Sequence, residues 1–273
     1  MKSGQIIGHD ACGVRTDSGE RVGMVPIVHC GSCYFCQRGM PNLCENGKTE
    51  GFDDDGFLAE FVAVPFANLL PIPNSVGDDE AAVLEPVALA IHTLNLLQPG
   101  LRDWVTIVGQ GPVGLLMTQV AKLKGCRVIA VDLQDYRLRL SEKYGADACI
   151  NAKSENPVKR VREITQRGSD IVIEAAGTKK TVEETPYLLR KAGKVALIGE
   201  MEGYLNIGEA SEALFFAGSL SSNEYPLAIE LISQKAVDVK GLITHRFKLA
   251  DFEQAIKVAD DSSQKPGKVV ITA

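Results

Sequence analysis

Four of the seven cysteines in this chain lie close together in sequence. Cys30, Cys33, Cys36 and Cys44 follow the spacing C-x2-C-x2-C-x7-C, on a segment rich in Gly, Ser, Asn and Pro. Four thiolates on one short loop can close a tetrahedron around zinc and leave no position for substrate, so the spacing predicts a structural zinc site. An iron–sulfur cluster and a redox-active dithiol use the same ligand type and stay open as alternatives. The other three cysteines are expected to be small core residues: Cys12, Cys126 and Cys149.

A second group of residues has the spacing of a dinucleotide-binding turn. Residues 109–114 read G-x-G-x-x-G, after the apolar run VTIVG and before a stretch with helical periodicity. In such a turn the first glycine permits the bend, the second lets the backbone approach a pyrophosphate, and the third lets helix and strand pack closely. The N–H groups of the helix N-terminus would then face the phosphates. The residues expected at the cofactor are Gly109, Gly111, Pro112, Val113 and Gly114.

Asp132 ends the next predicted strand and favours NAD as the cofactor. A carboxylate there can accept hydrogen bonds from both ribose hydroxyls of NAD and would repel the 2′-phosphate of NADP. Neither Leu133 nor Gln134 supplies a positive charge for that phosphate. Arg137 is assigned to the cofactor site, either near the adenine or solvated. The competing interpretation is a glycine-rich turn without a nucleotide, with Asp132 as a helix cap.

The elements around this turn alternate between strand and helix, which predicts a doubly wound parallel sheet. Strands are expected at 105–109, 127–132, 148–151, 170–176 and 194–199, and helices at 112–124, 135–144, 157–166 and 181–191. Before this region, residues 1–86 read as strand and loop, including a half-buried strand over 58–64, and a helix is expected over 80–97. After it, the pattern predicts a helix at 226–233, a strand in LITHRF, a helix at 249–259 and a final strand in KVVITA.

The composition is that of an ordinary globular protein of 273 residues, with 45% hydrophobic and 23% charged residues. The net charge of -6 and the lack of a basic stripe argue against nucleic acid as a partner. The most apolar stretch, 81–97, is too short and too polar to span a bilayer. Without a recognisable secretory signal, and with clustered cysteines, a cytoplasmic protein without a membrane partner is expected.

The motifs together resemble the zinc-dependent medium-chain dehydrogenases. The similarity rests on the four-cysteine loop, on the glycine turn and on Gly8-His9-Asp10-Ala11-Cys12-Gly13. Residues 83–88 (VLEPVA), 242–245 and 267–271 resemble the sorbitol and threonine dehydrogenase branch. The resemblance covers the whole chain and implies an α/β fold of two domains. Residues 87–222 would form a Rossmann NAD-binding domain, and 1–86 with 223–273 a GroES-like, β-rich catalytic domain carrying the zinc lobe.

The resemblance also implies roles for single residues. His9 and Glu85 would bind a catalytic zinc, and Asp10 stands where the family has a glutamate, as an alternate ligand or a neighbour of the ligands. Lys268 stands where the family places a basic residue on the pyrophosphate. Three residues at the ends of later strands would line the nicotinamide side: Ala176, Ile198 and Gly199.

The chain departs from the family before Gly8. Family members carry several dozen residues there, including a cysteine zinc ligand and a serine or threonine that relays the alcohol proton. We therefore expect an incomplete catalytic domain and a weak zinc site, since three protein ligands are usual for catalytic zinc. Cys12 is a poor replacement, because on a strand its side chain and that of His9 point to opposite faces.

The resemblance implies an NAD-dependent dehydrogenase that oxidises a secondary alcohol, polyol or amino alcohol to a ketone with the help of zinc. Two alternatives remain: an NAD-binding protein that has lost catalysis, and a zinc-independent NAD(P)H reductase. The number of bound zinc ions separates them, with two per chain for the dehydrogenase and one for either alternative. A homodimer or homotetramer is also implied, with the strand near 214–220 at its interface.

Overall fold

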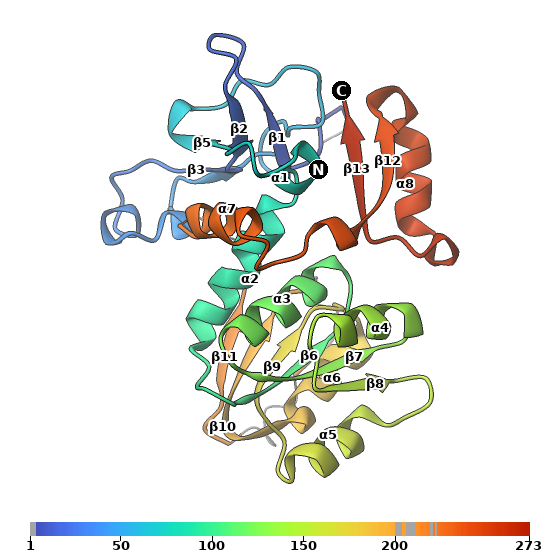
Figure 1. Cartoon of the computed structure of the whole chain (residues 1–273). Coiled ribbons are helices and arrows are strands. Elements are labelled where there is room, and N and C mark those ends of the chain that lie inside the picture. The colour runs from blue at the N-terminus through green and yellow to red at the C-terminus, as the bar shows by residue number, and fades with distance from the viewer. Residues whose placement is uncertain (1–3, 200–203, 206–210, 219–220, 222) are drawn as a thin grey trace. The chain divides into compact units, whose positions relative to one another are not determined.

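The computed structural model describes residues 4–199, 204–205, 211–218, 221 and 223–273. The chain packs as two compact units (Figure 1). The first unit joins Met1–Leu89 to Leu220–Ala273, and the second unit is Ala90–Ser219. These limits fall within a few residues of the two domains expected from the sequence.

The second unit is built on a six-stranded parallel sheet with the order β11-β10-β9-β6-β7-β8 (Figure 1). Its strands are β6 (Trp104–Val108), β7 (Arg127–Asp132), β8 (Ala148–Asn151), β9 (Ser169–Glu174), β10 (Leu189–Leu197) and β11 (Leu214–Ala217). The central strands β6, β7 and β9 bury continuous apolar runs, as expected for a parallel sheet that is covered on both faces. The order reverses between β6 and β9, which makes their boundary the topological switch point.

Four helices connect these strands: α3 (Pro112–Leu123), α4 (Asp135–Lys143), α5 (Pro157–Thr165) and α6 (Lys179–Leu188). Helices α3 and α4 pack on β6, β7 and β8, whereas α5 and α6 pack on β8, β9 and β10. Every strand and helix predicted in this region is present. The prediction was wrong about 189–191, which open β10, because Leu189 pairs with Ser169 of β9 just after α6 ends.

The first unit contains short strands in small sheets. β1 (Ala11–Val14), β2 (Arg21–Met24) and β5 (Leu69–Pro71) form one antiparallel sheet, and β3 (Ile27–Val28) pairs with β4 (Lys48–Thr49). β12 (Ile243–Lys248) and β13 (Lys268–Thr272) form a parallel pair. The helices of this unit are α1 (Asp78–Ala81), α7 (Tyr225–Ser233) and α8 (Phe252–Asp260), together with the start of α2 (Leu84–Leu97).

Two local predictions for the first unit were wrong. The segment 58–64 forms no strand. Phe61 within it is 78% exposed, and none of its residues is fully buried, so its alternating pattern meets no pairing strand among the described residues. The helix expected over 80–97 is interrupted after Ala81 and restarts as α2. Pro86 explains the restart, because proline lacks an N–H group and is tolerated only in the first turn of a helix. Within the described residues, no helix combines the length and the apolar character needed to cross a bilayer.

Candidate functional site

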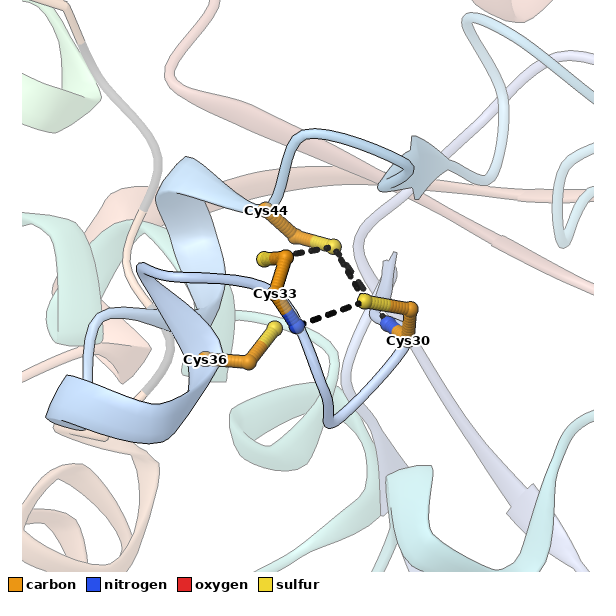
Figure 2. Close-up of side chains that lie close together, drawn as sticks. All are labelled: Cys30, Cys33, Cys36 and Cys44. Carbon is orange, nitrogen blue, oxygen red and sulfur yellow. Dashed lines mark hydrogen bonds between the residues drawn. The ribbon is translucent and has the colours of Figure 1, made fainter.

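The four cysteines of the predicted zinc lobe converge on one point (Figure 2). The sulfur of Cys44 lies 3.5 Å from that of Cys30 and 3.8 Å from that of Cys33, and all four sulfurs lie within 4.8 Å of one another. These separations are too long for a disulfide. A tetrahedron with Zn–S bonds of about 2.3 Å has edges of about 3.8 Å. The loop therefore fits a single zinc ion held by four thiolates.

Local hydrogen bonds favour the thiolate form of Cys30, which is the form that binds a metal ion. Hydrogen bonds from the backbone and hydroxyl of Ser32, and then from the amide of Cys33, lower the pKa of the Cys30 thiol to about 5. Burial and the neighbouring thiols instead raise the pKa of Cys36 to about 12. Four thiolates this close repel one another, so full deprotonation of the set requires a metal ion.

The remaining cysteines lie outside this loop. Cys126 is buried in the second unit, as predicted, whereas Cys12 is only partly buried and Cys149 is exposed. The core assignment of Cys149 was therefore wrong. Successive side chains of a strand point to opposite faces, and on β8 the next residue, Ile150, is the buried one. Cys12 donates a hydrogen bond to the carbonyl of Asp78.

His9, Asp10 and Glu85 come together in the first unit. Their ligand atoms lie within 4.8 Å of one another, and His9 Nε2 is 3.4 Å from Asp10 Oδ1. His9 and Asp10 directly precede β1, and Glu85 lies in the first turn of α2. Glu85 is only 7% exposed. Burial and the negative charge of Asp10 raise the pKa of Glu85 to about 8, because a second carboxylate charge is unfavourable there.

Lys268, the first residue of β13, forms an ion pair with Asp10 through Oδ2. Burial acts to lower the pKa of Lys268, but Asp10 and Glu85 outweigh it and raise the pKa. The pyrophosphate contact expected for Lys268 stays a prediction, since this structure directs its side chain to Asp10. That ion pair fixes one oxygen of Asp10 and leaves Oδ1 buried without a hydrogen-bond partner among the described residues.

These three side chains fit a divalent cation. Oδ1 of Asp10 is an unpaired buried acceptor beside an imidazole and a buried carboxylate. One nitrogen and two oxygens are a ligand set that zinc accepts, and three protein ligands leave a position open for substrate. Asp10, which the sequence offered only as an alternate ligand, would be the third donor of such a site.

The glycine turn of the second unit has the geometry that its sequence predicted. Gly109 leaves β6 with φ +92°, and α3 begins at Pro112 after Gly111. A side chain on Gly114 would overlap the carbonyl oxygen of Gly109, whereas one on Gly111 would meet no protein atom within 4 Å. Gly114 is therefore required for packing of the helix against the strand, whereas Gly111 leaves the backbone of the turn accessible to a ligand.

This accessible backbone borders a pocket of about 350 Å³. The predicted cofactor residues that line it are Gly109, Gly111, Asp132, Arg137 and Ala176. Pro112, Val113 and Gly114 form the first turn of α3 beside it. Ile198 and Gly199 follow the end of β10 and donate backbone hydrogen bonds to the carbonyl of Glu174.

Asp132 is held in place by the backbone on both sides. Its Oδ2 accepts from the amide of Gln110 at 2.7 Å, and its Oδ1 from the amide of Gln134 at 2.8 Å. Arg137 approaches Oδ2 at 3.7 Å. A carboxylate has about four acceptor positions, so both oxygens retain capacity for ribose hydroxyls. The side chain does not cap α4, whose N-cap is Gln134.

Sequence analysis missed two buried polar residues that support this pocket. The side-chain oxygen of Gln110 accepts from Thr118 and Ser141 and ties the glycine turn to α3 and α4. Glu174, which is fully buried at the end of β9, accepts from the amides of Ala176 and Gly177. Glu174 could have been found from the sequence, because it is an acidic residue directly after the apolar run Ile171-Val172-Ile173.

We predict that Cys36→Ser loses one zinc ion per chain and lowers Tm by roughly 5 °C, because three thiolates hold structural zinc less tightly than four. Elemental analysis and thermal unfolding measure the two effects. Cys149→Ser, which replaces an exposed cysteine outside the loop, is the control and should change neither quantity. A Cys36→Ser protein with full zinc and parental stability would contradict a structural site.

We predict opposite effects for alanine at two glycines of the turn. Gly114→Ala should destabilise the protein by about 1–3 kcal/mol, because the new methyl group overlaps the backbone of Gly109. Gly111→Ala should leave Tm unchanged but weaken NADH binding about tenfold, because it narrows the approach to the pyrophosphate. Calorimetry and fluorescence titration test the pair, and parental affinity in Gly111→Ala would refute a pyrophosphate at this turn.

Comparison with known proteins identifies the family of this chain. Residues 112–260 match the family model described as zinc-binding dehydrogenase, and residues 1–74 match the alcohol dehydrogenase GroES-like domain. The starvation-sensing protein RspB of Escherichia coli K12 is 32% identical, over 98% of this chain and 83% of that protein. L-threonine 3-dehydrogenase from Pyrococcus horikoshii is also 32% identical, over 99% of this chain and 82% of its own length.

Solved structures agree with the sequence matches. An alcohol dehydrogenase from Escherichia coli CFT073, in complex with NADH, superposes with a TM-score of 0.90 at 30% identity, over 100% of this chain and 85% of that one. The two family models, the relatives and the solved structure agree: the chain belongs to the zinc-dependent medium-chain dehydrogenase family.

Proposed function

We propose that this protein is an NAD-dependent dehydrogenase that oxidises a secondary alcohol, in a polyol or an amino alcohol, to a ketone. The observation that carries the proposal is the group His9, Asp10 and Glu85, which gathers three metal-binding side chains within 4.8 Å. The pocket beside the glycine turn supplies the second requirement, a place for the nicotinamide cofactor. The threonine dehydrogenases among the relatives favour a polar substrate.

In this proposal His9, Asp10 and Glu85 would hold a zinc ion, which when bound polarises the alcohol oxygen and lowers its pKa. The chain's own residues prepare the group. Lys268 fixes Asp10 through Oδ2 and leaves Oδ1 directed at His9. Glu85 keeps its proton near neutral pH because its pKa is about 8, and this proton must leave when a cation binds.

The cofactor proposal rests on Asp132. Its carboxylate lies in the pocket, next to the glycine turn, where it can accept hydrogen bonds from ribose hydroxyls. The same negative charge opposes a 2′-phosphate, which favours NAD over NADP. Arg137 at 3.7 Å offsets part of that charge, so the preference is expected to be finite.

The metal count is the first test of the proposed function. We predict two zinc ions per chain, one in the cysteine loop and one at His9, Asp10 and Glu85. His9→Ala and Glu85→Ala should each retain one zinc and lose alcohol oxidation, while His245→Ala, which contacts Thr244 outside the group, should keep both. A parent protein with a single zinc that His9→Ala does not remove would favour an NAD-binding protein without zinc chemistry.

Substitution of Asp132 tests the cofactor. We predict that Asp132→Ala weakens NAD binding about tenfold and narrows the preference over NADP, because the ribose acceptor and the repulsion of the 2′-phosphate are both lost. Asp147→Ala is the matched control: that carboxylate also accepts from a backbone amide, that of Val128, but lies outside the pocket. An equal loss of affinity for both cofactors would instead mean that Asp132 only supports the turn through Gln110.

We also expect a homo-oligomer formed through β11. This strand lies at one edge of the six-stranded sheet, where β10 is its one partner among the described residues, and Leu214 is 55% exposed. An uncovered edge of this kind favours pairing with a second copy. The predicted interface over 214–220 includes residues 219 and 220, which lie outside the described part of the chain. Leu214→Lys should shift the mass measured by light scattering toward the monomer, and a monomeric parent protein would rule the interface out.

A further inference from the structure

A second pocket of the nucleotide unit lies at the opposite end of the six-stranded sheet from the glycine turn. It has a volume of about 630 Å³ and is lined by Arg162, Arg167, Asp170, Leu189, Arg190 and Lys191. Asp170 and Leu189 lie at the starts of β9 and β10, whereas the glycine turn follows the end of β6, which runs parallel to β9. The six residues of β9 span about 17 Å, so this pocket is separate from the one proposed for the cofactor.

Gly168 brings the two segments that form this pocket into contact. It adopts φ +100°, and a side chain on it would lie 2.7 Å from the carbonyl oxygen of Leu189. The loop that follows α5 therefore lies directly against the start of β10. This close approach places Arg162 and Arg167, from the end of α5 and its loop, beside Arg190 and Lys191.

The lining of this pocket is strongly cationic. Four of its six residues carry a positive charge and one carries a negative charge, in a chain whose net charge is -6. A cleft lined by charges of one sign concentrates ions of the opposite sign. The charge of the pocket therefore favours an anionic ligand, against the negative charge of the chain as a whole.

Asp170, the one acidic residue of the lining, is already bonded within the protein. Its Oδ2 accepts from the amide of Trp104 at 2.8 Å, and its Oδ1 accepts from Nε of Arg190 at 2.6 Å. Arg190 also donates from Nη1 to the carbonyls of Lys191 and Ala192. These bonds hold the guanidinium group in one orientation and leave Nη2 without a hydrogen bond to the described residues. A planar donor that is held in this way loses little freedom when it binds an anion.

The other three cations have no carboxylate partner among the described residues. Arg162 donates to the backbone carbonyl of Tyr187 at 3.2 Å. The side chains of Arg167 and Lys191 are exposed and form no hydrogen bond or ion pair with the part of the chain that the structure describes. Their charges are therefore available to a ligand.

We propose that this pocket binds a small phosphorylated molecule. Guanidinium groups match the geometry of phosphate oxygens, and each can donate two hydrogen bonds to them. A phosphoryl group carries close to two negative charges at neutral pH, whereas a carboxylate carries one, so four gathered cations favour the phosphoryl group. The volume lies within the range of small-molecule sites. The proposal does not depend on the proposed function, because the cofactor pocket lies at the other end of the sheet.

Calorimetric titration of the intact protein with inorganic pyrophosphate tests the site. Arg167→Gln and Lys191→Gln should each weaken pyrophosphate binding about tenfold, because each removes one cation. Both variants should keep the parental Tm, since neither side chain contacts the described protein through a polar group. Arg139→Gln is the matched control: it makes the same change of charge at an exposed position on α4, outside the pocket, and should bind pyrophosphate as the parent does.

A further variant separates this pocket from the glycine turn, where pyrophosphate could also bind. Gly111→Ala should retain the affinity that Arg167→Gln reduces. Loss of binding in Gly111→Ala, with parental affinity in Arg167→Gln, would assign the anion to the glycine turn and overturn the proposal. Equal weakening in Arg167→Gln and Arg139→Gln would reflect net charge alone and overturn it as well. The same holds for a parent protein that binds no pyrophosphate at millimolar concentration.

Discussion

The absence of a side chain at Gly114 allows the close contact on which the nucleotide unit depends. Helix α3 begins so close to the end of β6 that any β-carbon at this position would overlap the carbonyl oxygen of Gly109. This contact brings the N-terminus of α3, with its free N–H groups, to the carboxyl end of the central strand. Two buried acidic residues then stabilise the surroundings of the turn, Asp132 through Gln110 and Glu174 through the turn that abuts Gly109.

Both acidic residues illustrate the same physical constraint. A buried carboxylate must be paired or fully hydrogen bonded, and here backbone amides supply most of the bonds. Because amides cannot move without the chain, each carboxylate makes its loop rigid. The shape of the pocket therefore depends on groups that its ligand need not contact. Carboxylates that would destabilise an ordinary apolar core hold the loops in place at this edge of the sheet.

In the first unit a lysine side chain compensates part of the buried negative charge. Asp10 and Glu85 would repel each other in a buried setting, and the ammonium group of Lys268 compensates one of them. The compensation is incomplete, since burial and Asp10 still raise the pKa of Glu85 to about 8 and Oδ1 of Asp10 accepts no hydrogen bond from the described residues. An excess of buried acceptors of this kind is what a divalent cation would relieve. The cysteine loop is a similar group of closely spaced donors, with sulfur atoms, that a metal ion would stabilise.

The sequence by itself determined the strand and helix alternation of the second unit, the glycine turn with Asp132, and the four-cysteine loop. These features are local: periodicity, glycine spacing and ligand spacing each extend over a few residues, so they can be recognised in the sequence before the fold is known. The tertiary structure alone decided that Lys268 faces Asp10, that Glu174 supports the pocket wall, and that 58–64 is not a strand. Each of these depends on a partner distant in sequence or on the absence of one, and neither burial nor strand pairing can be read from the residues of a single segment.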